Sequence, residues 1–137
     1  MGCRSCFELI NAQDELEATG KAKITPAFNL PSKFVLHTVG PIINKNVSEN
    51  DRTLLADCYR SCLKLAKTSG LKSVAFCCIS TGEFRFPNQQ AAEIAVQTVQ
   101  DFLAKNPEIS VIFNVFKEID LAIYQKLLLE KAPAISA

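Results

Sequence analysis

The segment whose residue types most clearly indicate a binding site is a loop of three small residues, Ser80-Thr81-Gly82. It follows the apolar run 74–79 and precedes a helical pattern that begins near Asn88. A strand that passes through such a loop into a helix presents free backbone N–H groups, which bind anions such as phosphate. Gly82 would also let the backbone approach a ligand closely or adopt a positive φ angle. The alternative is a tight strand-to-helix connection without a ligand.

Three phenylalanines accompany this loop. Phe84 and Phe86 follow it directly, and Phe116 ends a later apolar run. Phe84 could lie against a ribose, and Phe116 could stack on a base, a contact that contributes about 1–3 kcal/mol in single-strand complexes. The alternative for all three is packing in the core. The loop has neither the lysine of a P-loop nor the spacing of a dinucleotide fingerprint, so nucleotide hydrolysis at a Walker site is not expected.

Acid–base and metal chemistry have few candidates. Glu83 is the one carboxylate in the loop, and Asp120 follows the last apolar run, but either could be merely solvated. Cys3 and Cys6 have the spacing of half a zinc site, without a second pair to complete it. The single histidine, His37, falls inside a predicted strand, which argues against a Ser-His-acid triad. We expect no metal and no cofactor in this chain.

Composition limits the class of protein. A chain of 137 residues suits one domain with a sizeable core. A formal charge of +1 argues against non-specific nucleic-acid binding, and no apolar run approaches the roughly 20 residues of a membrane span. The N-terminal residues lack the apolar core of a signal peptide. The six cysteines are therefore expected to be reduced thiols, and the protein is expected to be cytoplasmic.

Hydrophobic periodicity predicts alternating strands and helices. The predicted helices cover residues 5–18, 51–69, 88–105 and 120–131, and the predicted strands cover 21–27, 33–39, 73–79 and 109–116. This order favours an α/β fold of three layers, with a mostly parallel sheet covered by helices on both faces. Ligands of such sheets bind at the carboxyl ends of the strands. Those ends bring together Gly40-Pro41, Ser80-Thr81-Gly82 and Phe116-Lys117.

Several of these segments resemble the macrodomain family. The resemblance runs from about Thr19 to Leu128 and rests above all on His37-Thr38-Val39-Gly40-Pro41 and Ile79-Ser80-Thr81-Gly82. Shorter matching segments are Thr19-Gly20-Lys21-Ala22-Lys23-Ile24-Thr25, Asn29-Leu30-Pro31-Ser32-Lys33, Cys58-Tyr59-Arg60, Phe86-Pro87 and Ala91-Ala92.

This resemblance implies an ADP-ribose site. The loop from residue 79 onward would wrap the diphosphate and the distal ribose, with Phe84 beside that ribose and Phe116 beside adenine. The implied ligand-binding residues are Ile79, Ser80, Thr81, Gly82, Glu83, Phe84, Arg85 and Phe116. A typical family loop has glycine at the position of Arg85, so the arginine is expected to alter or crowd the site. The loop looks most like that of the zinc-containing, sirtuin-linked branch, whose members remove ADP-ribose from proteins, and zinc is possible in full-length relatives.

The N-terminal residues depart from the family pattern. No segment before Thr19 matches the adenine-binding aspartate, the asparagine loop that faces the distal ribose, or the zinc ligands. We therefore expect a single macrodomain over residues 1–137 that lacks the family's first strands, with the recognisable part at 19–128. Three functions remain open: a hydrolase of ADP-ribosyl-proteins with Glu83 as a weak catalytic candidate, a non-catalytic ADP-ribose-binding module, or a ligand-free fragment. A sheet without its neighbouring strands would expose a pairing edge, which favours a homo-oligomer.

Overall fold

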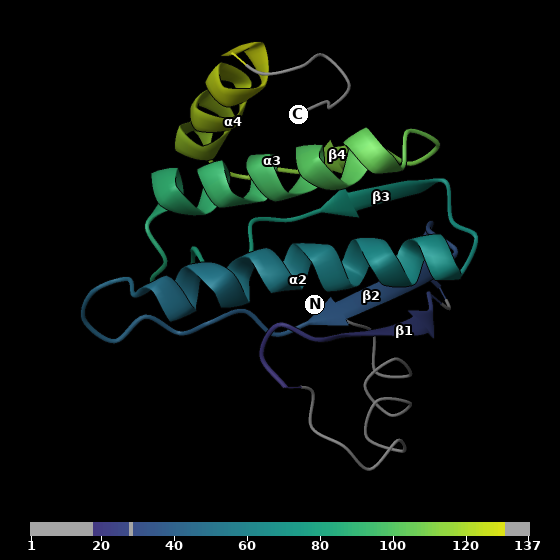
Figure 1. Cartoon of the computed structure of the whole chain (residues 1–137), viewed down its shortest axis with the longest axis horizontal. Helices are drawn as coiled ribbons and strands as arrows, with labels where there is room; N and C mark the ends of the chain where they lie inside the picture. Colours follow the sequence, from purple (N-terminus) through teal and green to yellow (C-terminus); the bar gives the residue numbers. More distant parts are fainter. Residues whose placement is uncertain (1–17, 28, 131–137) are drawn as a thin grey trace.

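The computed structural model describes residues 18–27 and 29–130, over which strands and helices alternate (Figure 1). The helix expected over residues 5–18, the Cys3–Cys6 pair and the C-terminal tail lie outside the described residues. The elements are β1 (Ala22–Pro26), β2 (Phe34–Thr38), α2 (Glu49–Thr68), β3 (Ser73–Phe76), α3 (Asn88–Lys105), β4 (Ser110–Phe113) and α4 (Glu118–Glu130).

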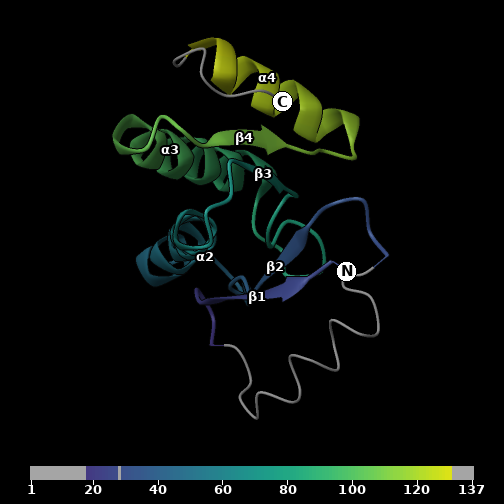
Figure 2. The same cartoon turned by 90° about the vertical axis from the view of Figure 1, so that its right-hand side faces the viewer.

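The strands form two small sheets instead of the single sheet expected from the sequence. β1 pairs with β2 in antiparallel register, and β3 pairs with β4 in parallel register. β2 and β3 point the same way and lie between β1 and β4, so the unpaired edges of β2 and β3 face each other (Figures 1 and 2). The parallel arrangement is thus confirmed for β3 and β4, but no hydrogen-bonded ladder joins β2 to β3 among the described residues.

Local signals explain where the two long helices begin and end. Ser48 caps α2: its hydroxyl accepts from the Asp51 amide at 3.1 Å, and the Asp51 carboxylate accepts from the Ser48 amide at 2.9 Å. This reciprocal capping starts α2 two residues before the predicted Asp51. Gly70, with a φ of 72°, follows α2 and lets the chain turn back toward β3. α3 has the bounds that the sequence predicted.

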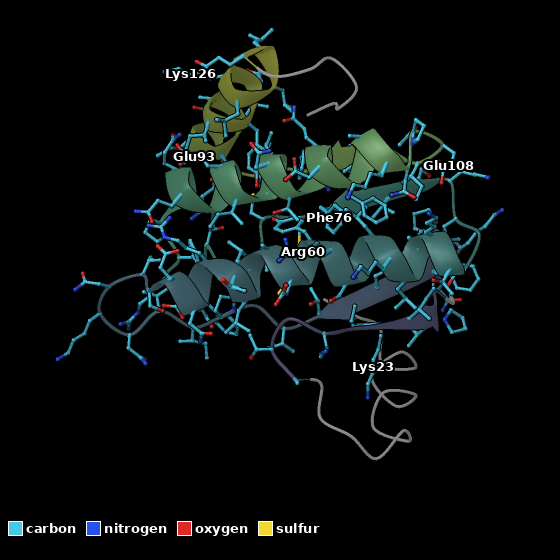
Figure 3. The ribbon with its side chains drawn as sticks, in the orientation of Figure 1. Lys23, Arg60, Phe76, Glu93, Glu108 and Lys126 are labelled. Carbon is cyan, nitrogen blue, oxygen red and sulfur yellow. The ribbon has the colours of Figure 1, made fainter. Side chains whose placement is uncertain are left out.

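An aromatic chain forms the centre of the core and links four elements. The rings of Tyr59 in α2 and Phe76 in β3 are 4.9 Å apart, and those of Phe76 and Phe113 in β4 are 6.3 Å apart. Tyr124 in α4 lies 5.0 Å from Phe113. Figure 3 shows Phe76 between α2 and α3, where the apolar faces of both helices meet the strands. Cys58 and Cys62 are buried in α2, as their spacing predicted.

Within residues 18–27 and 29–130, helices cover only one face of the strands. α2 and α3 lie on one side of the strands, and α4 lies beyond β4, where it packs against α3 (Figure 2). β3 and β4 therefore alternate between exposed and buried residues, and Ile112 is 48% exposed. The helix expected over residues 5–18 lies outside the described residues, so coverage of the second face stays a prediction. No described helix has the length and apolar character needed to cross a membrane.

Candidate functional site

The loops after β2 and β3 meet at the carboxyl ends of their strands. A Cβ atom built on Gly40 would lie 1.9 Å from the Ser80 hydroxyl oxygen and 2.8 Å from the Ile79 Cγ2 atom. A side chain at position 40 would thus collide with the β3 loop, so glycine is required there. The contact confirms that the two loops predicted to share this edge of the structure lie together.

A cleft of about 250 Å³ opens between the loops that follow β3 and β4. Residues of both loops form its walls, and α3 and α4 each contribute a residue from their first turn. The lining residues are Cys77, Cys78, Thr81, Gly82, Asn88, Asn114, Phe116, Lys117 and Asp120.

The amino end of α3 is the main polar feature of this cleft. Asn88 is the first residue of α3, the preceding Pro87 offers no side-chain acceptor, and the first turn contains no acidic residue. The free N–H groups and the positive end of the helix dipole at this terminus therefore favour an anion. Lys117 adds a cationic side chain to the same cleft.

Asp120 is tied to the base of the cleft. Its carboxylate is buried and accepts a hydrogen bond of 2.5 Å from the Asn88 side-chain amide, which joins the first turns of α3 and α4. The bond holds the two helix termini together, and it gives the Asp120 carboxylate a structural role. Glu83, the other candidate acid, is exposed and does not line the cleft.

The loop from Ser80 to Phe86 holds two residues in the left-handed region. Ser80 has a φ of 66° and Arg85 a φ of 65°, and such a conformation costs a non-glycine residue about 1–2 kcal/mol. The Ser80 hydroxyl is also buried without a hydrogen-bond partner among the described residues. Gly82, by contrast, does not adopt a positive φ, and a Cβ atom there would meet open space. Of the two alternatives expected for Gly82, the positive φ is not adopted, and close approach of a ligand is the one that fits the open space at its Cβ position.

The three phenylalanines have different environments. Phe86 is buried at 1% exposure and belongs to the core. Phe84 is partly buried, and its carbonyl accepts from the Ile43 amide at 2.8 Å, which joins the loop to the segment after β2. Phe116 is 99% exposed at the mouth of the cleft, so the core-packing alternative is wrong for this residue. A free aromatic ring at a polar cleft suits stacking on a base.

The structure brings together only part of the predicted site. Thr81, Gly82 and Phe116 line the cleft, whereas the remaining predicted contacts lie beside it: Ile79, Ser80, Glu83, Phe84 and Arg85. Sequence reasoning missed Cys77, Cys78, Asn88 and Asn114 as lining residues. Only their position in the sequence could have identified these four residues, because each lies just beyond the end of a strand or at the start of a helix.

Burial makes several thiols poor nucleophiles. It raises the pKa of Cys78 to about 11 and that of Cys62 to about 12, and it also raises the pKa of Cys58. Cys77 is exposed. Among residues 18–27 and 29–130, no group of three His, Cys, Asp or Glu side chains is placed to hold a metal ion, so the described side chains do not fit a zinc site.

Comparison with known proteins gives consistent results. A sequence model of the macro domain family matches residues 3–95. A protein-ADP-ribose hydrolase from Treponema medium is 60% identical over 124 residues, which cover 90% of this chain and 48% of that protein. A protein-ADP-ribose hydrolase from Staphylococcus aureus strain MSSA476 is 53% identical, over 88% of this chain and 46% of that protein. The chain thus spans about half the length of these curated relatives.

Solved structures agree in fold. The Oceanobacillus iheyensis macrodomain with ADP has a TM-score of 0.83 and 42% identity, covering 94% of this chain and 70% of that one. The Trypanosoma brucei macrodomain in complex with ADP-ribose has a TM-score of 0.74 and 35% identity, covering 81% of this chain and 46% of that one.

Proposed function

The chain belongs to the macro domain family, and on this basis we propose that the cleft between the loops after β3 and β4 binds ADP-ribose. The observation that carries the proposal is the pairing of an uncapped helix terminus with a fully exposed aromatic ring at one cleft. ADP-ribose has the matching chemistry, because it joins a diphosphate to an adenine base.

Each part of the ligand has a proposed partner. The diphosphate would lie at Thr81, Gly82 and the amino end of α3, and adenine would stack on Phe116. At about 250 Å³ the cleft is smaller than the ~300–1,000 Å³ of common ligand sites. It would therefore enclose the diphosphate region, with the base on the exposed ring and the distal ribose against the 79–85 segment.

Hydrolysis is a second proposal, supported by the printed names of the relatives. Removal of ADP-ribose from a protein needs a positioned water and a general acid or base. Of the two carboxylates near the cleft, Asp120 is bonded to Asn88 and Glu83 lies outside the lining. The described residues thus support ADP-ribose binding more strongly than turnover.

The binding proposal can be tested by removing the aromatic ring of Phe116. Phe116→Ala should weaken ADP-ribose binding by about five- to 150-fold, because base stacking contributes about 1–3 kcal/mol. Ribose-5-phosphate, which has no base, should lose little affinity. Titration calorimetry with both ligands provides the measurement. Equal losses would assign Phe116 to packing, and no ADP-ribose binding by the unaltered chain would overturn the proposal.

Self-association and location are further proposals. The outer edge of β1, which has no partner strand among the described residues, supports a homo-oligomer formed by strand pairing, which light scattering after size-exclusion chromatography would detect. The described cysteines, Cys58, Cys62, Cys77 and Cys78, are free thiols, which supports a cytoplasmic location.

A further inference from the structure

Arg85 occupies a backbone conformation that favours glycine. Its φ of 65° lies in the left-handed region, although it is neither a glycine nor an asparagine. Its side chain is exposed and forms no hydrogen bond or ion pair within the described part of the chain. The intramolecular contacts of the side chain therefore do not compensate for the backbone strain. Strain of this kind is typically retained at functional sites.

The loop that carries Arg85 is held firmly. The Arg85 amide donates to the Gly82 carbonyl at 3.0 Å, and the Phe86 amide donates to the Ser80 carbonyl at 2.8 Å. The buried Phe86 ring anchors the end of the loop. The structure thus fixes the base of a cationic side chain while leaving its guanidinium in solvent.

The position of Arg85 indicates what this cation meets. Thr81 and Gly82 line the cleft, but Arg85 lies outside it. With adenine on Phe116 and the diphosphate at Gly82, as proposed above, the distal ribose would lie against the 79–85 segment, which includes Arg85. The distal ribose is the end of ADP-ribose that is joined to a modified protein. This step rests on the proposed function.

We propose that Arg85 is a specificity-determining residue that contacts acidic side chains next to the modified residue of an ADP-ribosylated protein. A guanidinium is suited to this role because it pairs with carboxylates through two parallel hydrogen bonds. Lys45 is exposed on the segment that the Ile43–Phe84 hydrogen bond joins to this loop, and it adds positive charge. Glu83 is the nearby opposing charge, and it is also exposed.

The test uses two synthetic peptides, each carrying ADP-ribose through a non-hydrolysable triazole. Aspartates flank the modified residue in one peptide, and asparagines flank it in the other. The unaltered chain should bind the aspartate peptide about three- to tenfold more tightly, and the preference should vanish in 1 M salt, where the Debye length is about 3 Å. Arg85→Lys should keep most of the preference, and Arg85→Gln should abolish it. In Arg85→Gln, the loss of affinity for the aspartate peptide should exceed any loss of affinity for free ADP-ribose or for the asparagine peptide, because the proposed contact is with acidic side chains of the peptide.

Two controls separate charge from folding. Arg85→Gly should abolish the preference without lowering the melting temperature, because relief of the left-handed strain offsets the greater entropy of glycine in the unfolded chain. Arg60→Gln removes a cation from α2 (Figure 3) that pairs with Asp57 and does not line the cleft, and it should keep the preference.

Other outcomes would overturn the inference. Equal binding of both peptides by the unaltered chain would do so while leaving ADP-ribose binding intact. A loss of free ADP-ribose affinity in Arg85→Gln as large as the loss for the peptide would assign the arginine to the diphosphate. Failure of the unaltered chain to bind free ADP-ribose would overturn the proposed function and this inference together.

Discussion

At the scale of single residues, the two glycines near the site have opposite roles. Gly40 is enclosed by the β3 loop, whereas Gly82 faces open space on the wall of the cleft. One glycine therefore serves the fold, and the other serves access for a ligand. This difference gives a matched pair of substitutions.

Gly82→Val should weaken ADP-ribose binding by at least about tenfold, or ~1.4 kcal/mol, and leave the free energy of unfolding nearly unchanged. The added side chain enters the cleft but meets no protein atom within 4 Å at its Cβ position. Gly40→Ala should instead destabilise the fold by about 1–3 kcal/mol, because its methyl group collides with Ser80 and Ile79. Calorimetry and urea denaturation of both variants distinguish the effects. Unchanged affinity in Gly82→Val would remove this residue from the site.

Thiol reactivity should follow burial. At pH 8, iodoacetamide should alkylate Cys77 well before Cys78, Cys62 and Cys58, because burial raises the pKa values of those three thiols and leaves little thiolate. ADP-ribose should slow the labelling of Cys77, which lines the cleft. Peptide mapping by mass spectrometry measures each site separately. Labelling of Cys77 that is indifferent to saturating ADP-ribose would place the ligand elsewhere.

At the scale of elements, the β1–β2 pair contains the group that titrates near neutral pH. His37 in β2 is bonded to Thr25 in β1, with 2.9 Å between the His37 Nε2 and Thr25 Oγ1 atoms. Burial lowers the pKa of His37 below its ordinary value of 6.5. The unfolded chain therefore takes up the proton first as the pH falls, so the stability is complete above about pH 6.5 and decreases below it.

His37→Gln should flatten this dependence. Between pH 7 and 5.5 the midpoint of urea denaturation should decrease for the unaltered chain and stay nearly constant for the variant. A parallel decrease in both proteins would assign the effect to other groups.

Much of the element pattern could be predicted from sequence, for identifiable reasons. α3 is amphipathic along its whole length, so its bounds are evident from the apolar spacing of Ala92, Val96 and Val99. The strand predicted over residues 73–79 ends at Phe76, because its pairing with β4 stops there and Cys77 and Cys78 line the cleft instead. No sequence signal distinguishes an apolar residue that pairs from one that lines a cavity.

The candidate site was predictable at its centre and less so at its walls. A loop of small residues after a buried strand identified Thr81 and Gly82. The positive φ angles fell on Ser80 and Arg85 instead of Gly82, because the loop is shaped by hydrogen bonds from the Phe86 and Arg85 amides. Those bonds depend on the anchoring of Phe86 in the core, which is a tertiary effect.

At the scale of the whole molecule, turnover is expected to be slow. The Treponema medium relative, used at full length, should remove ADP-ribose from an ADP-ribosylated protein far faster than residues 1–137 of this chain. The physical reason is that neither carboxylate near the described cleft is both free and within it. Glu83→Gln should change the residual rate little. If the unaltered chain shows robust turnover and Glu83→Gln abolishes it, the expectation is contradicted and Glu83 is catalytic.

The facing, unpaired edges of β2 and β3 have a consequence for how the molecule melts. The two sheets share no ladder among the described residues, and α2 packs on β1 and β2 while its Tyr59 ring contacts Phe76 in β3. Cooperativity between the sheets is thus transmitted by the side chains of α2 and by the loop contacts, which are the packing of Gly40 on Ser80 and the Ile43–Phe84 hydrogen bond. A two-stranded hairpin is marginal by itself, so the β1–β2 pair should melt first. Scanning calorimetry should accordingly give a calorimetric enthalpy larger than the van 't Hoff enthalpy, the signature of a domain that unfolds in more than one step.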